Sequence, residues 1–236
     1  MENTFYKREI KVSVKILYED NHLLVVVKPP YVPVQEDISG ARDLLNILKE
    51  DLKVRYNKPG NVYLGLVHRL DRPVGGVMVF AKTSKAASRL SWQIREHETE
   101  KIYLCVVKGC PDVLKGRLRD FLLKDKVNNK VKVVKPNTPN SKEALLEYEV
   151  LEHKQGLSLV KVRLLTGRSH QIRVQMAHNG TPLFGDVKYG FAGSGEENLA
   201  LWSYQMEITH PIKKERMKFS SPPPDGYPWN LFKQLM

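Results

Sequence analysis

The chain has 236 residues, of which 42% are hydrophobic and 27% are charged, a balance that is typical of globular proteins and excludes an intrinsically disordered chain. Its 38 lysines and arginines outnumber 26 acidic residues and leave a net charge of +12, which favours a polyanionic partner such as nucleic acid. Two cysteines, Cys105 and Cys110, and scattered histidines indicate neither a disulfide framework nor a metal site. The first residues lack the apolar core of a signal peptide and no apolar run is long enough to span a membrane, so we expect a cytoplasmic protein.

Two strand patterns and a helix pattern open the chain. Residues 10–18 alternate apolar and polar side chains, which is the period of a half-buried strand. Residues 23–28 are almost entirely apolar and predict a central strand that ends at Pro29. Residues 43–54 follow with helical spacing of their leucines and predict an amphipathic helix. The leucines that define its apolar face are Leu45, Leu48 and Leu52.

The middle of the chain predicts a strand over residues 76–82 and then a helix with Ser84 as its N-cap. On that helix Ala86, Leu90 and Ile94 share one face. Three more strands are predicted over residues 100–109, 143–152 and 159–165, the last two as an antiparallel pair with alternate residues pointing inward. The inward residues of the pair are Leu146, Tyr148, Val150, Val160, Val162 and Leu164. Residues 127–141 are polar, basic and rich in proline and asparagine, so we expect an exposed hairpin or loop that contacts the partner.

The last part of the chain predicts a short helix that begins near Ser169 and is stopped by Asn179 and Gly180. A further strand covers residues 199–211, and a proline-rich tail ends in a short helix. No repeat or long linker divides the chain. We therefore predict one α+β domain over residues 1–236, built on a large mixed, mainly antiparallel sheet with flanking helices and an active-site cleft. Its ends are an N-terminal extension (1–9) and a C-terminal tail (221–236).

The segment HRLDRPVGGVMVFAKTS places Asp71 between Arg69 and Arg72. Pro73 and the following glycines predict a tight turn there. A cation close to the carboxylate would lower its pKa and keep it ionised, which suits a nucleophile or general base better than a general acid. Most aspartates flanked by arginines are nevertheless structural, so the alternative is a surface salt bridge.

The segment TGRSHQIRVQMAHNG contains the helix predicted from Ser169, whose free N–H groups would form an anion site. His170 and Arg173 lie three residues apart and would share one face of it. The alternative is a helix that packs Ile172 and Met176 inward and leaves its cations in solvent.

Taken together, four segments resemble the RluA family of pseudouridine synthases over most of the chain. They are LYEDNHLLVVVKPP, HRLDRPVGGVMVFAKT, EKIYLCVVKG and TGRSHQIRVQMAHNGTPLFGDVKYG. The resemblance implies the pseudouridine synthase fold and the isomerisation of specific uridines in transfer or large-subunit ribosomal RNA. It implies no cofactor, no metal and no membrane, and we expect a monomer.

Three departures from the family pattern stand out. Val74-Gly75-Gly76 replaces the usual Thr-Ser-Gly, which removes two hydroxyls that could brace the turn. Val27 and Gln35 replace the Asn and His that are common around the Lys-Pro element, so we carry no function onto them. About 15 residues precede the first matching strand, too few to fold as a domain, so we expect a short form without the N-terminal RNA-binding module.

The resemblance also assigns roles to single residues. Asp71 would be the essential carboxylate, Arg173 the buried arginine that pairs with it, and Tyr103 the aromatic that stacks on the uracil and relays the C5 proton. From its strand pattern alone, Tyr103 would be an ordinary core aromatic. The expected substrate-binding residues are His68, Arg69, Arg72, Lys82, Arg168, His170 and Ile172, although Lys82 could equally be a solvated lysine at a strand end.

Two other functions compete with the RNA isomerase. One is a non-catalytic RNA-binding protein of the same fold, which would not need Asp71, Tyr103 and Arg173 together. The other is a metal-dependent hydrolase that uses His68 and Asp71, which would need further ligands that the sequence does not offer.

Overall fold

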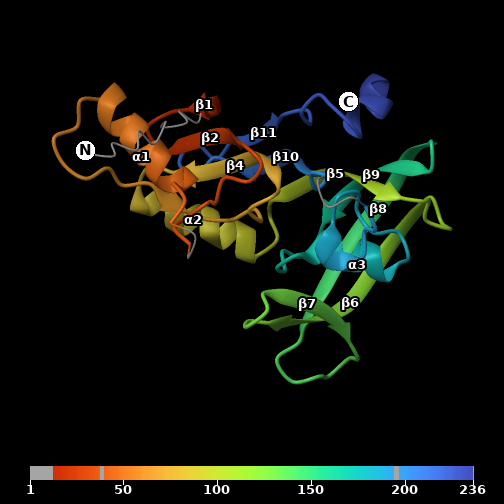
Figure 1. Cartoon of the computed structure of the whole chain (residues 1–236). Helices are drawn as coiled ribbons and strands as arrows, with labels where there is room; N and C mark the ends of the chain where they lie inside the picture. The colour runs from red at the N-terminus through yellow and green to blue at the C-terminus, as the bar shows by residue number, and fades with distance from the viewer. Residues whose placement is uncertain (1–12, 38–39, 194–196, 236) are drawn as a thin grey trace, which may run out of the picture.

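The computed structural model describes residues 13–37, 40–193 and 197–235. These residues form one sheet of eleven strands with three α-helices and two short 3₁₀ helices (Figure 1). The strands are β1 (Lys15–Glu19), β2 (Leu23–Lys28), β3 (Gly65–Leu66), β4 (Gly75–Ala81), β5 (Glu100–Lys108), β6 (Lys115–Asp125), β7 (Lys130–Val134), β8 (Lys142–Lys154), β9 (Leu157–Leu164), β10 (Leu201–Thr209) and β11 (Arg216–Ser220). The helices are α1 (Leu44–Arg55), α2 (Ser84–Arg95), α3 (Gln171–His178), η1 (Val187–Tyr189) and η2 (Trp229–Leu235).

The strands run in the order β1-β2-β4-β10-β5-β9-β8-β6-β7, with β3 added to β4 and β11 added to β10. Among these pairs β4 and β10 are parallel, and the other paired strands are antiparallel. The sheet therefore confirms the predicted α+β class and the mixed, mainly antiparallel architecture.

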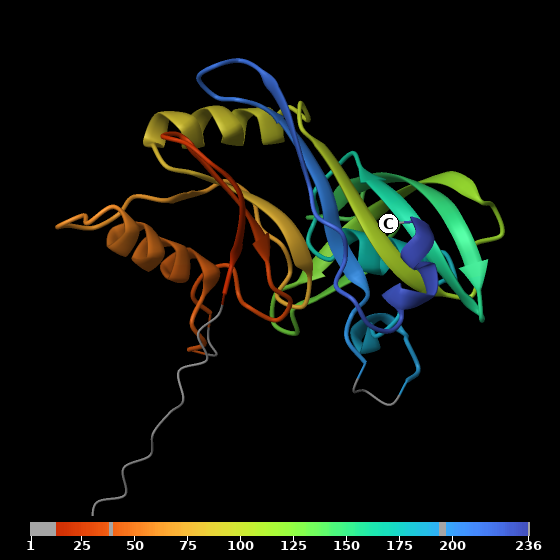
Figure 2. The same cartoon turned by 90° about the horizontal axis from the view of Figure 1, so that it is seen from above.

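The part of the sheet around β2 and β4 is covered on both faces. Leu24 and Val26 pack on the α1 side, whereas Leu23 and Val25 pack on the α2 side (Figure 2). Burial on both faces explains why these strands are continuous apolar runs instead of alternating ones.

Both long helices begin at a side-chain cap. Asp43 caps α1 by accepting a hydrogen bond from the Asn46 N–H at 3.0 Å. Of the predicted apolar face, Leu48 and Leu52 are buried and Leu45 packs partly buried against the same core, which also contains Leu44. In α2 the prediction of Ser84 as N-cap was wrong. Thr83 has the extended backbone of a cap and its Oγ1 accepts from the Ala86 N–H at 3.2 Å, which places Ser84 in the first turn.

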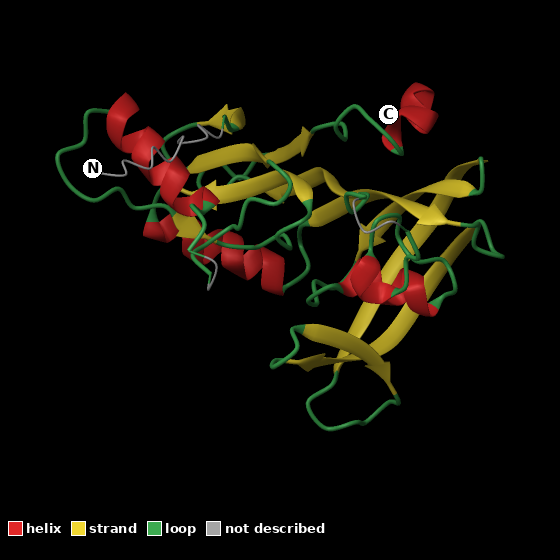
Figure 3. Cartoon of the chain, in the orientation of Figure 1, coloured by secondary structure: helices red, strands yellow, loops and turns green. Residues whose placement is uncertain are grey.

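The other part of the sheet carries a long hairpin. β6 pairs with β8 over residues 115–122 and with β7 over residues 121–125, so the hairpin forms the edge of the sheet and reaches beyond α3 (Figures 1 and 3). The predicted exposed hairpin at residues 127–141 thus supplies one strand, β7, and its partner β6 is a strand that the sequence did not predict. We call β6, β7 and the turn between them the arm.

The helix predicted from Ser169 begins two residues later, at Gln171. His170 occupies the cap position in the left-handed region, with φ of 53°. The Gln171 side chain prevents an earlier start, because its Oε1 accepts from the Thr166 hydroxyl at 2.8 Å and from the Arg168 N–H at 3.0 Å and so holds these residues in a turn. The predicted stop is confirmed, because α3 ends at His178, before Asn179 and Gly180.

The structure describes the C-terminal tail up to residue 235 but not the first 12 residues. The first predicted strand survives in β1, whereas Ile10, Val12 and the extension at residues 1–9 lie outside the described residues. The tail docks through Trp229 and Phe232, which are buried against the β5–β9 face of the sheet. No described helix has both the length and the apolar character needed to cross a membrane.

Candidate active site

Asp71 opens a turn that leads into β4, the strand in the middle of the covered part of the sheet. The Val74 N–H donates to the Asp71 carbonyl at 3.0 Å and closes this turn, as the proline and glycines predicted. Lys28, at the end of β2, braces it: its ammonium donates to the carbonyls of Arg72 at 2.9 Å and Val74 at 2.7 Å. It also donates to the Pro29 carbonyl at 3.0 Å, so three acceptors meet its three protons. The turn is therefore held by hydrogen bonds to its main-chain carbonyls, from the Val74 N–H and from Lys28.

Two glycines follow Val74, and the first of them, Gly75, belongs to the departure from the family pattern. A Cβ on Gly75 would lie 2.2 Å from the Trp202 ring, and one on Gly76 would lie 2.2 Å from the Ser203 carbonyl oxygen. Gly76 also has φ of +117°, which side chains rarely adopt. The close approach of β4 to β10 thus requires glycine at both positions.

The two arginines that flank Asp71 in sequence do not pair with it. Arg69 Nη1 lies 3.5 Å from Gln35 Oε1, and Arg72 donates to the Tyr31 carbonyl at 3.2 Å and lies 3.7 Å from the Asp37 carboxylate. The simple salt bridge to a neighbouring arginine is therefore excluded, and the cation that faces Asp71 comes from elsewhere.

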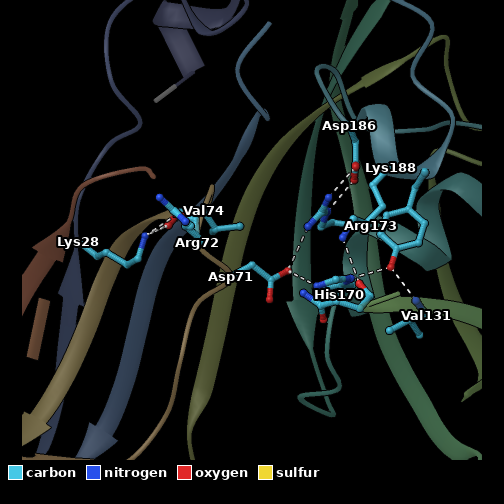
Figure 4. A network of polar contacts seen from close by, with 11 residues as sticks. Lys28, Asp71, Arg72, Val74, Val131, His170, Arg173, Asp186 and Lys188 are labelled. Atoms are coloured by element: carbon cyan, nitrogen blue, oxygen red, sulfur yellow. Dashed lines mark hydrogen bonds and ion pairs between the residues drawn. The ribbon is translucent and has the colours of Figure 1, made fainter. Parts of the chain in front are cut away.

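That cation is Arg173 of α3. Its Nη1 lies 3.5 Å from Asp71 Oδ2, and His170 Nε2 lies 3.8 Å from the same oxygen (Figure 4). The closer partner of Arg173 is Asp186, which accepts from Nε and Nη2 at 2.7 Å each. Both members of this bidentate pair are buried. Although desolvation opposes the charge, these carboxylates raise the pKa of Arg173 further.

Tyr189 holds both groups that face Asp71. Its ring lies against the Arg173 guanidinium, 5.2 Å from centroid to Cζ, and its hydroxyl lies 2.6 Å from His170 Nδ1. The same hydroxyl accepts from the Val131 N–H of the arm at 2.9 Å (Figure 4). Desolvation lowers the pKa of His170, against the pull of the Asp71 charge, so the imidazole is neutral at neutral pH. The contact at Nδ1 fixes the orientation of the ring, so that Nε2 faces Asp71.

Asp71 borders a cavity of about 510 Å³ whose lining also includes Tyr103, Ile172 and Arg173. Tyr103 projects from β5 and is 8% exposed, and Ile172 is 4% exposed, so both present the little surface they have to the cavity. Burial raises the pKa of Tyr103 to about 12, opposed by its hydrogen bond with Ser203 and assisted by the Asp71 charge. The Tyr103 hydroxyl therefore stays protonated.

The remaining predicted residues fall into two groups. His68, Arg69, Arg168 and His170 line the cavity, whereas Arg72 and Lys82 do not. Lys82 is bound to Glu19 at 2.6 Å at the far end of β4, about 20 Å along that strand from the Asp71 turn, so it lies outside the cavity and its substrate contact stays a prediction.

His68 has a structural task as well. Its Nε2 accepts from the Val79 N–H at 3.0 Å and thereby continues the pairing of β3 with β4. Desolvation and the nearby Lys101 charge lower the pKa of His68 to about 3, so the ring is neutral. This engaged lone pair argues against His68 as a metal ligand, and the described residues contain no cluster of three or more His, Cys, Asp or Glu side chains that could hold a metal ion.

Lys28, Asp186 and Tyr189 were missed as site residues. A signal for each was present: Lys28 belongs to the Lys-Pro element, and the other two belong to GDVKYG at the end of the long second signature. Their family positions were quoted in the resemblance, but no residue pattern indicated which side chains they contact.

Comparison with known proteins gives a family. The model of the RNA pseudouridylate synthase family matches residues 22–178. This range is most of the chain and includes both the Asp71 turn and α3. The chain belongs to this family. Within it, the similarity to ribosomal large subunit synthases of the C and D types confirms the resemblance to the RluA family, whose members convert uridine to pseudouridine in RNA.

Relatives of this RNA pseudouridylate synthase extend the comparison. An uncharacterized RNA pseudouridine synthase of Aquifex aeolicus is 36% identical over 231 residues, covering 92% of this chain and 71% of that protein. Ribosomal large subunit pseudouridine synthase D of Borreliella burgdorferi is 32% identical, covering 85% of this chain and 63% of its own length. Ribosomal large subunit pseudouridine synthase D of Pseudomonas aeruginosa is 34% identical, and the match covers 93% of this chain and 71% of that protein. The chain thus spans about two thirds of the length of these relatives.

Two solved human structures share the fold. RNA Pseudouridylate Synthase Domain Containing 4 superposes with a TM-score of 0.76 at 22% identity and covers 89% of this chain and 88% of its own. RNA Pseudouridylate Synthase Domain Containing 1 gives a TM-score of 0.71 at 24% identity, with coverages of 91% and 85%. The expected pseudouridine synthase fold is therefore confirmed.

Proposed function

We propose that this RNA pseudouridylate synthase isomerises uridine in the cavity beside Asp71, with Asp71 as the reacting carboxylate. The observation that carries the proposal is the environment of that side chain. Asp71 is 28% exposed, so substrate can reach it, while Arg173 and the Nε2 of His170 face one of its oxygens. A carboxylate that faces both a cation and the cavity is placed to react with a bound nucleotide as a nucleophile or base.

The reaction breaks the N1–C1′ bond of uridine, turns the uracil and joins C5 to C1′. The proton on C5 is lost and N1 gains one, so no electrons, metal or cofactor are consumed. Asp71 would attack the sugar or the base or remove the 2′ proton, and each of these roles needs its ionised form. Tyr103 and Ile172 would hold the detached base between them. The protonated Tyr103 hydroxyl suits hydrogen bonding to the uracil better than acceptance of the C5 proton as a phenolate.

Large-subunit ribosomal RNA is the substrate that we propose first, with the chain acting as a monomer in the cytoplasm. Several relatives are named for that RNA, and the net charge of +12 suits a structured polyanion. The Lys and Arg excess would grip phosphates while the target nucleotide leaves the stack and enters the cavity.

The test compares wild type with Asp71→Asn on ribosomal and transfer RNA from cells that lack this gene. Pseudouridines are located by carbodiimide labelling and primer extension. We expect a new stop with wild type and none with Asp71→Asn, a loss of at least 100-fold in rate, while the thermal midpoint and RNA affinity stay close to those of wild type. Asp51→Asn, on the exposed side of α1, is the matched control and should retain full activity.

Residual activity of Asp71→Asn above a few per cent would remove Asp71 from the central role. RNA binding by wild type without a new stop on either RNA would favour the non-catalytic RNA-binding protein. A stop on transfer RNA instead of ribosomal RNA would keep the reaction and change the substrate.

A further inference from the structure

A second cavity lies beside the first, between the arm and the turn that precedes α3. Its volume is about 690 Å³, and it shares Gly167, Arg168 and Ser169 with the lining of the Asp71 cavity. Two buried side chains of the arm, Leu122 and Val131, form an apolar part of its wall. The two cavities are therefore neighbours separated by one short turn.

The charges that line the two cavities differ. The second cavity is lined by Lys124, Lys126, Lys142 and Arg168, and no acidic side chain contributes to it. The Asp71 cavity, in contrast, contains the carboxylates of Asp71 and Glu100. A hollow with an apolar wall and only cationic charge suits a ligand that is both flat and anionic, which is the chemistry of a nucleotide.

We propose that the second cavity binds an unpaired nucleotide adjacent to the uridine that is isomerised. The inference rests on the proposed function, because the first cavity must hold an RNA uridine for the second to hold its neighbour. The base would lie against Leu122 and Val131, and the phosphates on either side would lie between Lys124 and Lys142. A volume of about 690 Å³ lies within the common range for small-molecule sites of about 300–1,000 Å³.

Arg168 is fixed at the boundary between the cavities. Its Nε donates to the Glu143 carbonyl at 2.8 Å, and its own N–H donates to the Gln171 side chain at 3.0 Å. An arginine anchored in this way can contact the phosphate that links two nucleotides without losing much side-chain entropy. The positions of the cavities therefore predict that the enzyme distinguishes RNA by an unpaired neighbour as well as by the target uridine.

The test measures equilibrium binding of uridine and of pentauridylate to the intact chain. The charge variant is Lys124→Ala with Lys142→Ala, and its matched control is Lys108→Ala with Lys154→Ala, two exposed lysines at the C-terminal ends of β5 and β8. We expect about tenfold weaker pentauridylate binding in the charge variant and a salt slope lower by about 1.4, since each phosphate contact to a single strand contributes about 0.7. Uridine, which carries no phosphate, should bind the charge variant and wild type equally.

Ser141→Trp tests the shape of the cavity, because the indole would occupy it without removing a charge. It should weaken pentauridylate binding and leave the binding of uridine in the Asp71 cavity unaffected. The proposal is overturned if the control pair loses as much affinity as the charge variant, if Ser141→Trp has no effect, or if hexaglutamate binds as tightly as pentauridylate. Wild-type isomerisation of RNA is measured in parallel: its absence refutes the proposed function, whereas its presence with any of those three results refutes the second subsite alone.

Discussion

The two sides of the Asp71 cavity are held together in different ways. On the β4 side, side chains bind main-chain groups, because Lys28 donates to three carbonyls and His68 accepts from a backbone N–H. On the α3 side, side chains bind side chains, because Arg173 is held by Asp186 and His170 by Tyr189. The carboxylate thus sits on a turn that the backbone defines, and the groups that face it depend on the identity of their supporting residues.

This difference predicts how substitutions on the two sides affect the position of Asp71. The β4 side lies between two covered faces and every residue of β4 is buried, so the Asp71 turn is positioned by the core itself. The α3 side has a helix of eight residues without a side-chain cap, and it depends on the ion pair and on the arm. We therefore expect substitutions on the α3 side to disturb the geometry around Asp71 more readily than conservative changes in the sheet.

The strongest test of this comparison is Asp186→Asn, which removes one charge from the buried pair and keeps the shape of the side chain. It leaves the Arg173 guanidinium without its bidentate partner, so we expect a loss of about 3–5 kcal/mol in the free energy of unfolding. Urea unfolding followed by fluorescence measures it. We expect the isomerisation rate to fall as well, because Arg173 would no longer be held beside Asp71.

Glu149→Gln is the control for Asp186→Asn. It breaks the exposed pair between Lys115 and Glu149, 2.7 Å apart, and should lower the free energy of unfolding far less than Asp186→Asn does, because exposed ion pairs contribute little to stability. Equal losses in the two variants would mean that the Arg173–Asp186 pair contributes no more than a surface salt bridge, and the contrast between the two sides would fail.

On the β4 side, Lys28→Met keeps the apolar stem and removes the ammonium. Burial lowers the pKa of Lys28 to about 7 from an ordinary value of 10.5, with the Asp71 charge opposing and the Arg72 charge assisting. Between pH 7 and 10 the unfolded chain then binds more protons at this residue than the folded chain does. The free energy of unfolding of wild type should therefore rise with pH, relative to Lys28→Met, by up to about 1.4 kcal/mol per pH unit.

Urea unfolding at pH 7, 8 and 9 measures that slope. Lys108→Met, which alters an exposed lysine, should have the same slope as wild type. Parallel curves for wild type and Lys28→Met would show that the folded chain keeps Lys28 protonated throughout, with its three carbonyl contacts outweighing the cost of burial.

Some of this arrangement was predictable because its signals are local or concentrated in motifs. The leucine spacing of α1 and the turn from Asp71 to Val74, with Pro73 inside it, each reflect a constraint within a few residues. The resemblance to the family also predicted that Asp71, Tyr103 and Arg173 belong to one active site, and all three line the same cavity. No pattern of residues alone would have predicted this, because the three segments lie far apart in the chain.

Other parts depended on contacts that the sequence does not display. β6 has charged residues along much of its length and becomes a strand through its pairing with β7 and β8. Lys28 follows an apolar run, where a lysine is ordinarily exposed, and its burial depends on carbonyls 44 and 46 residues away. Asp186 reaches Arg173 only because the chain reverses at Gly185, where a Cβ would lie 2.3 Å from the Asn198 carbonyl oxygen.

Tyr189→Phe gives the smallest expected effect and separates positioning from stability on the α3 side. The ring and its contact with Arg173 remain, but the hydroxyl that lies beside His170 and accepts from Val131 is lost. We expect kcat to fall about tenfold with KM unchanged, since the ring of His170 would lose its fixed orientation toward Asp71 while the RNA surface stays intact. Tyr148→Phe, which removes a hydroxyl bonded to the Val113 carbonyl in the core, is the matched control and should leave kcat unaltered. If the two variants changed kcat alike, or if Tyr189→Phe raised KM instead, Tyr189 would have only a packing role and the side-chain network would not position the reacting groups.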